Sequence, residues 1–451
     1  MEGLWFIALF SAICLEGLGR RYLPQIPAVA FYFLKDLVLL YGYFRYRPPP
    51  SVVRSVRYLY RGFGIVVVAG MAWTVIELFN PEQESFLLGL IGLRAYWLWW
   101  LAPGVIAGML QNSKLKRRAI YALGLMALGI AILAAFQFSS PADSNLNLYT
   151  VKDGEEIHSS DMAVVYSTGR ARVAGTFAFL SGFVAFTMTI PTLLLSLGLE
   201  VKEVRLRRVA LVAALAVAAT LPMSGSRGSV LIGAAVLVLT MWTGGLFFTR
   251  VGRRIVIAGV AAAILSVVAF PDALLGVQSR FGDTEETNGR FMEIATYLPP
   301  VALAMDDYPL AGIGTGMQQN ARYSFNLVSE WQQEGEIERY LTELGPVGFL
   351  LIWTAKLGLV FALLRAYAIL KRAGKRGAAG AALSYAVLTM VGSLAFDHNW
   401  QALYFTGCGF ILAEVVPLLR AGLPVPAPAL APVVQVALPE RTVAALEEIR
   451  S

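Results

Sequence analysis

Arginine is the residue of this chain whose placement most directly suggests chemistry. Arg170, Arg172, Arg227 and Arg290 each lie near the boundary of an apolar run or in a long polar connection. An arginine presents a planar fork of N–H donors that matches a phosphate group, and it stays charged at physiological pH. Several arginines that converge at one membrane face would suit the diphosphate of a lipid carrier. For any single arginine the alternative is a local ion pair or a side chain extended to the membrane interface.

Glycines and carboxylates form the second chemical pattern, between two apolar runs near the C-terminal third. Residues 308–316 read YPLAGIGTG, and residues 341–348 read LTELGPVG. Residues 334–338 between them carry the acidic side chains Glu334, Glu336 and Glu338. A carboxylate near a desolvated site can have a raised pKa and act as a general base. The alternative is the solvated face of an amphipathic helix.

Composition places these patterns in a membrane protein. The chain has 451 residues, of which 57% are hydrophobic and 15% charged, and its mean hydropathy is +0.63. A soluble domain carries roughly 25% charged residues. The two cysteines, Cys14 and Cys408, lie inside apolar runs, which argues against a disulfide framework or a thiolate metal site. The first apolar run lacks a basic flank and a small-residue cleavage site, so we predict a retained helix.

A membrane-spanning helix needs about 20 mostly apolar residues. Such runs predict an all-α integral membrane protein with about twelve transmembrane helices, near 3–18, 26–44, 62–79, 86–110, 119–138, 173–198, 207–222, 229–248, 254–271, 344–370, 380–396 and 402–419. Basic side chains fill alternate connections, near residues 45–61, 114–118, 202–208, 250–254 and 371–376. Because lysine and arginine mark cytoplasmic loops, this alternation predicts that both termini are cytoplasmic. The net charge of +7 is thereby explained by topology, and no nucleic-acid partner is expected.

The side of the membrane opposite to the basic connections is predicted to carry two long extracytoplasmic loops, 139–172 and 272–343. The second loop lies between spans 9 and 10. The second loop holds twelve acidic residues and four arginines. The membrane domain is predicted to cover residues 1–421, and residues 422–451 a low-complexity cytoplasmic tail. Charges inside spans need partners, because they are costly in lipid. Lys35 and Asp36 are sequence neighbours, so on a helix they point in different directions, whereas Arg94 is predicted to join the diphosphate site.

These pieces together resemble the O-antigen ligase and polymerase superfamily of integral membrane proteins. The pieces follow one another in the family's order: RVAGTF at 172–177, SGSRG at 224–228, GR at 289–290 with PLAGIGTG at 309–316, and Leu341-x-Glu343-x-Gly345-x-x-Gly348 at the entry to a span. Each piece alone is common. Four pieces in order, each on the expected membrane side, extend the resemblance over about residues 172–370.

The resemblance implies a GT-C-like glycosyltransferase that uses an undecaprenyl-diphosphate-linked glycan as donor and needs no metal or other cofactor. Arg172, Arg227 and Arg290 would then bind the diphosphate, with Arg170 and Arg94 beside them. Gly312, Gly314 and Gly316 would shape the loop backbone, together with Glu343 and Gly345. The resemblance also implies a location in the inner (plasma) membrane of a bacterium and a glycan or lipid-linked acceptor. It leaves open whether a chain-length regulator is a partner.

One departure from the family affects the predicted general base. Many ligases carry a His-Asn pair about nine residues before the Glu-x-Gly element, where this chain has Glu334. We therefore expect the base to be Glu334, Glu336, Glu338 or His398, the last within the sequence DHN at 397–399. The missing pair favours a polymerase of O-antigen or exopolysaccharide over a ligase that transfers glycan to lipid A core or protein.

Two functions of other classes remain as alternatives. A transporter or flippase of twelve spans would place polar residues near the bilayer centre in discontinuous helices. The unusual residues of this chain instead cluster at one face, which favours an enzyme. A non-catalytic assembly subunit of a polysaccharide machine is disfavoured by the three motif arginines and mildly favoured by the missing loop histidine.

Overall fold

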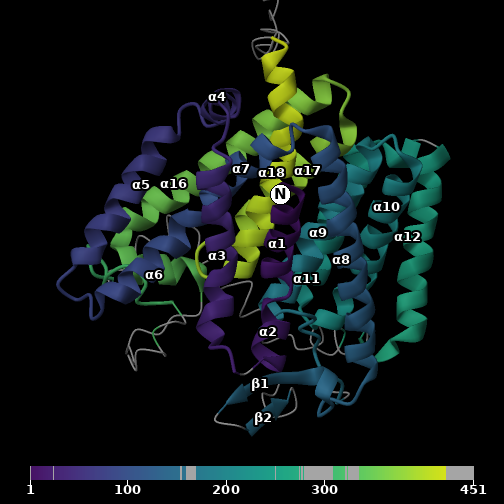
Figure 1. Ribbon diagram of the computed structural model, residues 1–451, viewed down its shortest axis with the longest axis horizontal. Coiled ribbons are helices and arrows are strands. Elements are labelled where there is room, and N and C mark those ends of the chain that lie inside the picture. The colour runs from purple at the N-terminus through teal and green to yellow at the C-terminus, as the bar shows by residue number, and fades with distance from the viewer. Residues whose placement is uncertain are drawn as a thin grey trace, which may run out of the picture.

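Each of the twelve apolar runs predicted from the sequence overlaps a helix or a bent pair of helices in the computed structural model. The structure describes residues 2–23, 25–152, 155–158, 169–248, 250–273, 275, 278, 308–319, 322 and 335–422. Within these residues the chain is helical apart from one antiparallel hairpin, so the predicted all-α fold holds for the body of the molecule (Figure 1).

The elements are named as in Figure 1. The first half contains α1 (Glu2–Cys14), α2 (Glu16–Tyr22), α3 (Ala28–Arg45), α4 (Pro50–Leu59), α5 (Gly64–Ile76), η1 (Glu77–Phe79), α6 (Phe86–Trp97), η2 (Leu98–Leu101), α7 (Ala102–Met109), α8 (Ser113–Ser139), η3 (Asn145–Asn147), β1 (Leu148–Lys152) and β2 (Glu155–His158). The second half contains α9 (Leu180–Glu200), α10 (Val204–Ala219), η4 (Leu221–Ser224), α11 (Arg227–Thr243), η5 (Leu246–Phe248), α12 (Arg250–Ala269), α16 (Glu336–Arg372), α17 (Arg376–Val391) and α18 (His398–Arg420).

Length and composition single out five spans able to cross a membrane within the described residues: α6 to α7, α8, α9, α16 and α18. Two bent pairs raise the number to seven, α1 with α2 at 62° and α4 with the α5–η1 helix at 95°. Three further helices, α10, α11 and α17, have 16 or 17 residues and are shorter than a full span. Twelve crossings therefore stay a prediction, whereas a helical membrane protein is supported.

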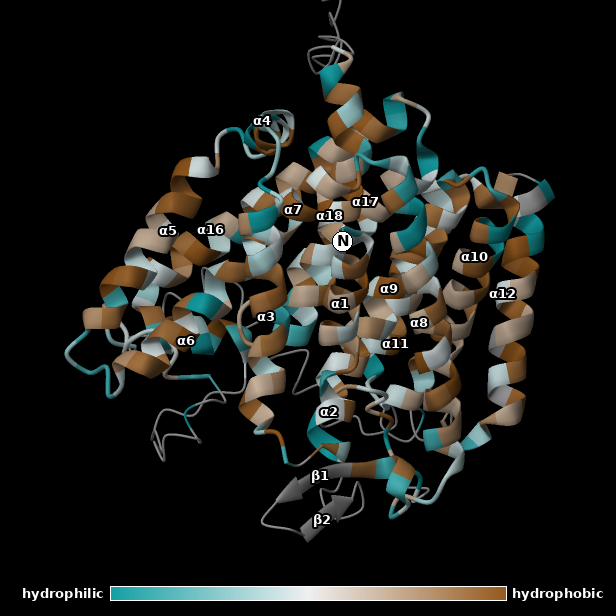
Figure 2. Ribbon diagram, viewed as in Figure 1, coloured by the Kyte–Doolittle hydropathy of each residue, from teal (hydrophilic) through white to brown (hydrophobic). Residues whose placement is uncertain are grey.

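The outer faces of the helices are apolar. Ile65, Val68, Ile257, Leu265 and Val268 are each more than 60% exposed on α5 and α12. An extended exposed apolar surface marks a membrane contact in a stable protein. Figure 2 shows hydrophobic residues along the middle of the helices and hydrophilic residues mostly towards their two ends. The core itself is built around α9 and α18, whose apolar windows are largely buried inside the protein.

Four of the five basic connections come together at one end of the bundle, which we call the basic end. Lys116 and Lys375 both contact the carboxylate of Glu414 in α18. The Glu200 carboxylate accepts a 2.8 Å hydrogen bond from the amide of Gly377, and Arg365 Nη1 donates to the carbonyl of Arg61 at 2.8 Å. These contacts join residues that the sequence predicts to share one membrane side. The helix α4 and the end of α18 both lie at the top in Figure 1.

The opposite end carries α2 and the β hairpin, which lie at the bottom in Figure 1. The first helix starts at the basic end, where the rings of Trp5 and Tyr46 lie 6.4 Å apart. Both ends of the described chain therefore lie at the basic end, while the helix junctions described below lie at the opposite end.

Candidate functional site

The first two motif pieces, RVAGTF and SGSRG, meet at the opposite end. Arg172 Nε donates to the carbonyl of Ser224 at 3.3 Å, and the Val173 amide donates to the carbonyl of Met223 at 3.0 Å. Gly225 turns this segment in the left-handed region with φ of 66°, and Ser226 caps α11 by accepting from the Ser229 amide. Arg227 is the first residue of α11. The structure thus brings Arg172 to the turn that carries Arg227.

The same RVAGTF segment continues against α2. Arg21 Nη1 donates to the carbonyl of Gly175 at 3.0 Å and Nη2 to that of Phe177, while the Leu18 amide donates to the carbonyl of Thr176 at 3.1 Å. Arg21 is buried, so these carbonyls replace water around its guanidinium. Arg21 therefore holds in place the strand-like segment that positions Arg172.

A second group of side chains, which we call the polar cluster, surrounds the ring of Tyr32 in α3. It consists of Glu16, Arg20, Tyr32, Lys35, Asp36, Arg94, His398 and Asn399. The guanidinium of Arg94 lies 4.4 Å and that of Arg20 5.5 Å from the Tyr32 ring centre, and the ring of His398 lies 4.9 Å away. Cations over an aromatic face are attracted by the negative face of the ring. One tyrosine therefore gathers cations from α2, α3 and α6.

Three ion pairs fix the polar cluster, and Glu16 takes part in two of them, with Arg20 at 2.7 Å and with Lys35. Lys35 contacts Glu16 and donates to Asn399 Oδ1 at 3.0 Å, whereas Asp36 binds Arg94 and accepts from Trp99 Nε1 at 2.9 Å. The prediction that Lys35 and Asp36 point in different directions and need separate partners is confirmed. Removing one partner of such a pair leaves an uncompensated buried charge, which is the costly change.

His398 joins the cluster to the start of α18. Arg94 Nη1 lies 3.5 Å from His398 Nε2, and a hydrogen bond between them requires the His398 tautomer in which Nε2 accepts and Nδ1 carries the proton. Among the described residues neither His398 Nδ1 nor Arg20 Nε has a hydrogen-bond partner. In that tautomer His398 offers an N–H donor at Nδ1, whereas in the other tautomer Nδ1 could accept a proton, so the predicted role of His398 as a base stays a prediction.

Asp397 sets the position of His398 by capping α18. Its carboxylate accepts from the amides of Asn399 at 3.0 Å and Trp400 at 2.9 Å. Burial raises the pKa of the Asp397 carboxyl above its usual range, and these two hydrogen bonds and the nearby Lys35 oppose that shift. The cap fixes the first turn of α18 and with it the direction of His398.

The third and fourth motif pieces form one packed unit. The Ile313 amide donates to the carbonyl of Thr342 at 2.8 Å, and the Gly314 amide to that of Glu343 at 3.1 Å. The Glu343 carboxylate is fully buried and accepts from the Gln318 amide at 2.6 Å and from Tyr96 Oη at 2.8 Å. Glu343 therefore holds the glycine-rich loop, residues 308–319, against α16 and α6.

The backbones of the glycine-rich loop and α16 lie so close together that two positions, Gly312 and Gly345, have no room for a side chain. Gly312 in the loop and Gly345 in α16 have φ of 71° and 65°, and a Cβ on either would lie 2.4 Å or less from a carbonyl oxygen of the other segment. Gly345 also has ψ of 179°, a combination that other residues rarely adopt. Gly314 and Gly316 have φ of 103° and 89°. The bend at Gly345 separates a first short part of α16 from its long apolar part.

Gly345→Ala is expected to destabilise the protein more than Gly374→Ala does. Both positions have positive φ, which costs roughly 1–2 kcal/mol for other residues. Only the Gly345 Cβ would meet a backbone atom, the Leu310 carbonyl oxygen at 2.1 Å, whereas nothing lies within 4 Å of the Gly374 Cβ. Thermal unfolding in detergent compares the two variants. Equal losses of stability would mean that the packing of the loop on α16 contributes little.

Residues 392–399 connect the glycine-rich loop to the polar cluster. Gln319 Nε2 donates to the carbonyl of Ala395 at 3.3 Å, and the Leu394 amide donates to Glu336 Oε1 at 3.2 Å. His398 follows directly in the same segment. The loop, the start of α16 and the cluster thus share one connecting segment.

The predicted site residues fall into distinct surroundings. Glu336 accepts from Tyr340 Oη at 2.6 Å and from Lys356 Nζ at 2.9 Å, so its carboxylate is engaged within the protein. Glu338 lies in the first turn of α16. Arg170 pairs with Asp272 at 3.2 Å and donates to the Ser139 carbonyl at 3.0 Å, away from Tyr32. Arg290 and Glu334 lie outside the described residues.

The sequence did not single out Glu16, Tyr32 or Asn399, although the structure places them in the polar cluster. Glu16 could have been found from the sequence, because it is a carboxylate within the first apolar run and so requires a partner. In the structure that partner is Lys35. Tyr32 and Asn399 could not have been found in this way, since tyrosine and asparagine near span boundaries are ordinary. Arg172 and Arg94 are brought to the same end of the bundle but belong to separate groups, which the RVAGTF segment and α2 connect.

The chemical character of the arrangement is a small excess of positive charge. Arg20, Arg21, Lys35 and Arg94 carry four positive charges, against the carboxylates of Glu16, Asp36 and Asp397. Within the described ranges no group of three or more histidine, cysteine or acidic side chains could hold a metal ion. The sequence matches no protein-family model and no curated protein.

Proposed function

We propose that the protein is a membrane glycosyltransferase that polymerises lipid-linked glycan repeat units at the end opposite to the basic connections. The observation that carries the proposal is two groups of arginines away from the basic end, Arg172 beside the turn that carries Arg227, and Arg20 with Arg94 around Tyr32. Positive residues otherwise collect on the basic end, as the positive-inside tendency requires. Arginines kept on the other side suit the diphosphate of an undecaprenyl-diphosphate-linked donor.

The proposed chemistry needs stabilisation of a leaving diphosphate. When the bond from the anomeric carbon to the diphosphate breaks, negative charge develops on phosphate oxygens, and preorganised donors in a partly dehydrated site stabilise it. Arg172 and Arg227 on one side and Arg94 with the N–H of His398 on the other would supply these donors. The acceptor hydroxyl attacks the opposite face of the anomeric carbon, so the configuration inverts.

The proposed general base is a carboxylate at the start of α16. Of the predicted candidates Glu334, Glu336, Glu338 and His398, we place the base at Glu338 in the first turn of α16, with Glu334, which precedes it in the sequence, as the alternative. A carboxylate in a dehydrated site can take the proton of the acceptor hydroxyl as the new bond forms. The glycine-rich loop fixes the segment that carries Glu338 through Thr342 and Glu343.

The proposed setting is the inner membrane of a bacterium, with both termini in the cytoplasm and a GT-C-like bundle of twelve spans. The joining of basic connections at one end supports this orientation, and the overlap of each apolar run with a helix supports the count. The long connection 272–343 would then face the glycan substrates.

Polymerisation is tested with purified protein and an undecaprenyl-diphosphate-linked oligosaccharide from the native host. We expect a ladder of longer lipid-linked glycans on a gel, which Arg290→Ala removes because it takes away one diphosphate-binding arginine. A product that forms only when lipid A core is added would identify a ligase instead. Binding of the donor without either product would contradict both transferase functions.

A transporter of lipid-linked sugars is the second candidate. The buried charges of Lys35, Asp36 and Arg94 inside α3 and α6 favour it, because intramembrane charges often mark a transport path. Proteoliposomes separate the two functions. Movement of a labelled lipid-linked glycan across the membrane without chain elongation would support the transporter and contradict the polymerase.

A further inference from the structure

The short helix α4 at the basic end is strongly amphipathic. Val52, Ser55 and Leu59 are buried on one face, whereas Arg54 and Arg57 are exposed on the other. The apolar side chains of Val52, Val56 and Leu59 follow one another at helical spacing, which is typical of a helix that lies in a membrane interface. The helix axis turns by 95° into the following apolar helix, so α4 and α5 do not form one straight span.

Both ends of α4 are fixed to other helices. Arg365 Nη1 from α16 donates to the carbonyl of Leu59 at 2.6 Å, which satisfies a terminal carbonyl of α4. Arg420 at the end of α18 contacts the hydroxyl of Ser51 at the start of α4. Because both ends are held, the space beneath α4 is set by the fold.

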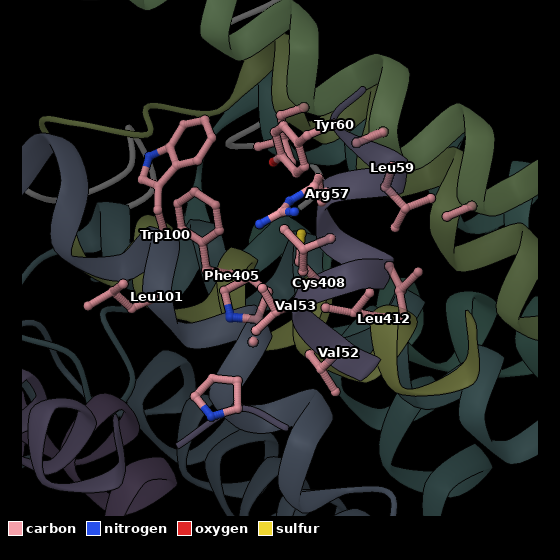
Figure 3. Close-up of a pocket in the computed structure, with 18 of the residues that line it drawn as sticks. Val52, Val53, Arg57, Leu59, Tyr60, Trp100, Leu101, Phe405, Cys408 and Leu412 are labelled. Carbon is pink, nitrogen blue, oxygen red and sulfur yellow. The ribbon is translucent and has the colours of Figure 1, made fainter. Parts of the chain in front are cut away.

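That space is a partly open apolar cavity of about 460 Å³ (Figure 3). Its walls come from α4, from η2 with α7, and from α16 and α18, and they include Trp100, Phe405 and the thiol of Cys408. Arg57 is the charged side chain among the lining residues, and Figure 3 shows its guanidinium directed towards the cavity. An apolar cavity with one cation at its edge has the character of a lipid site.

The charge around the cavity indicates which class of lipid headgroup would bind there. Residues 45–61 carry five arginines and no acidic residue, namely Arg45, Arg47, Arg54, Arg57 and Arg61. Polybasic segments next to membrane helices attract anionic lipids electrostatically. A zwitterionic headgroup would gain less from the same arginines.

We propose that the cavity beneath α4 binds one anionic phospholipid from the membrane leaflet at the basic end. An acyl chain fills the space between α4, α16 and α18, and the phosphate binds Arg57. Since α4 packs against α16 and α18, the bound lipid would stabilise that packing. This site lies at the end of the bundle away from the polar cluster and does not depend on the proposed glycosyltransferase activity.

The headgroup contact is tested by native mass spectrometry of the full-length protein in detergent, with phosphatidylglycerol and phosphatidylcholine as probes. We expect tighter binding of phosphatidylglycerol and about a fivefold loss of its affinity in Arg57→Gln, the equivalent of about 1 kcal/mol. Arg205→Gln is the matched control, because Arg205 is exposed in α10 and lines no part of the cavity. Equal binding of the two lipids, or equal losses in the two variants, would overturn the proposal.

The apolar part is tested by filling the cavity. Gly104 lines it, and a Cβ there would make only ordinary contacts with Pro48 at 3.5 Å or more, so Gly104→Leu should fold. Gly129→Leu in α8 is the control, since nothing lies within 4 Å of its Cβ. We expect Gly104→Leu to lose phosphatidylglycerol binding and Gly129→Leu to keep it, with thermal unfolding as the check on folding. Retained binding in a folded Gly104→Leu, or tighter binding of an isoprenoid phosphate than of phosphatidylglycerol, would overturn the proposal.

Discussion

Arg172→Ala is expected to lower the rate of glycan transfer by about 100- to 1,000-fold, the typical cost of removing one preorganised donor from a developing anion. The bond from Arg172 Nε to the Ser224 carbonyl orients the guanidinium before substrate binds, so little reorganisation is needed during the reaction. The measurement is the single-turnover rate of chain elongation with saturating lipid-linked donor. Because the charge develops as the bond breaks, the loss should fall mainly on kcat and less on donor affinity.

Arg170→Ala is the matched control for this prediction. Arg170 lies two residues earlier, but its guanidinium is taken by Asp272 and the Ser139 carbonyl. A partly exposed ion pair contributes roughly 0–1 kcal/mol to stability, and this arginine is held away from the proposed diphosphate site, so the control should leave the rate of transfer little changed. Comparable losses in the two variants would mean that the effect comes from the fold of segment 169–179. An unchanged rate in Arg172→Ala would remove Arg172 from the proposed site.

Arg94→Met is expected to destabilise the protein by about 3–5 kcal/mol, because it leaves the Asp36 carboxylate buried without its cation. Asp36 is 3% exposed and would keep only the indole N–H of Trp99 as a partner. Thermal or denaturant unfolding in detergent measures the loss. Arg117→Met is the control, because the Arg117–Glu203 pair is long at 3.5 Å and about half exposed, and its loss should cost about 1 kcal/mol or less.

The double variant Arg94→Met with Asp36→Leu separates stability from function. Replacing both members of a buried pair by apolar residues is often neutral, so most of the lost stability should return. Glycan transfer should not return, because the cation near His398 is still missing. A double variant that regains activity together with stability would show that Arg94 acts only in folding.

Hydropathy predicts where the helices lie but not how they bend. The break between α1 and α2 and the turn from α4 into α5 fall within or beside apolar runs that read as straight spans. In particular, residues 45–61 read only as a basic connection, although the apolar residues Val52, Val56 and Leu59 already had helical spacing. The predicted topology, by contrast, depends on the number of lysines and arginines in each whole connection. An error of a few residues in a helix boundary therefore does not change it.

Residues of the candidate site could be predicted from the sequence only where the residue type itself requires a partner in the fold. Lys35 and Asp36 signal a need for partners, because charge in an apolar helix is costly. Their partners could not be named, since Asn399 lies 364 residues from Lys35 and Arg94 lies 58 residues from Asp36. The role of Glu343 was predicted only as loop shaping from the resemblance, and its contacts with Tyr96 and Gln318 depend on a packing that no local pattern encodes.

The glycine-rich loop also has a consequence for the order in which the protein is made. One side of the loop contacts early residues, since Asn80 Nδ2 donates to the Gly312 carbonyl at 3.0 Å and the loop packs on Leu88 and Gly92 of α6. The other side contacts Thr342 and Glu343, which the ribosome adds later. When the ribosome has added residue 319, the nascent chain already contains every proposed diphosphate-binding arginine. The backbone carbonyls of Thr342 and Glu343, which bind the loop, have not yet been synthesised. The end of the bundle that carries the proposed site is therefore completed late in synthesis, so an unfinished chain does not have a complete site.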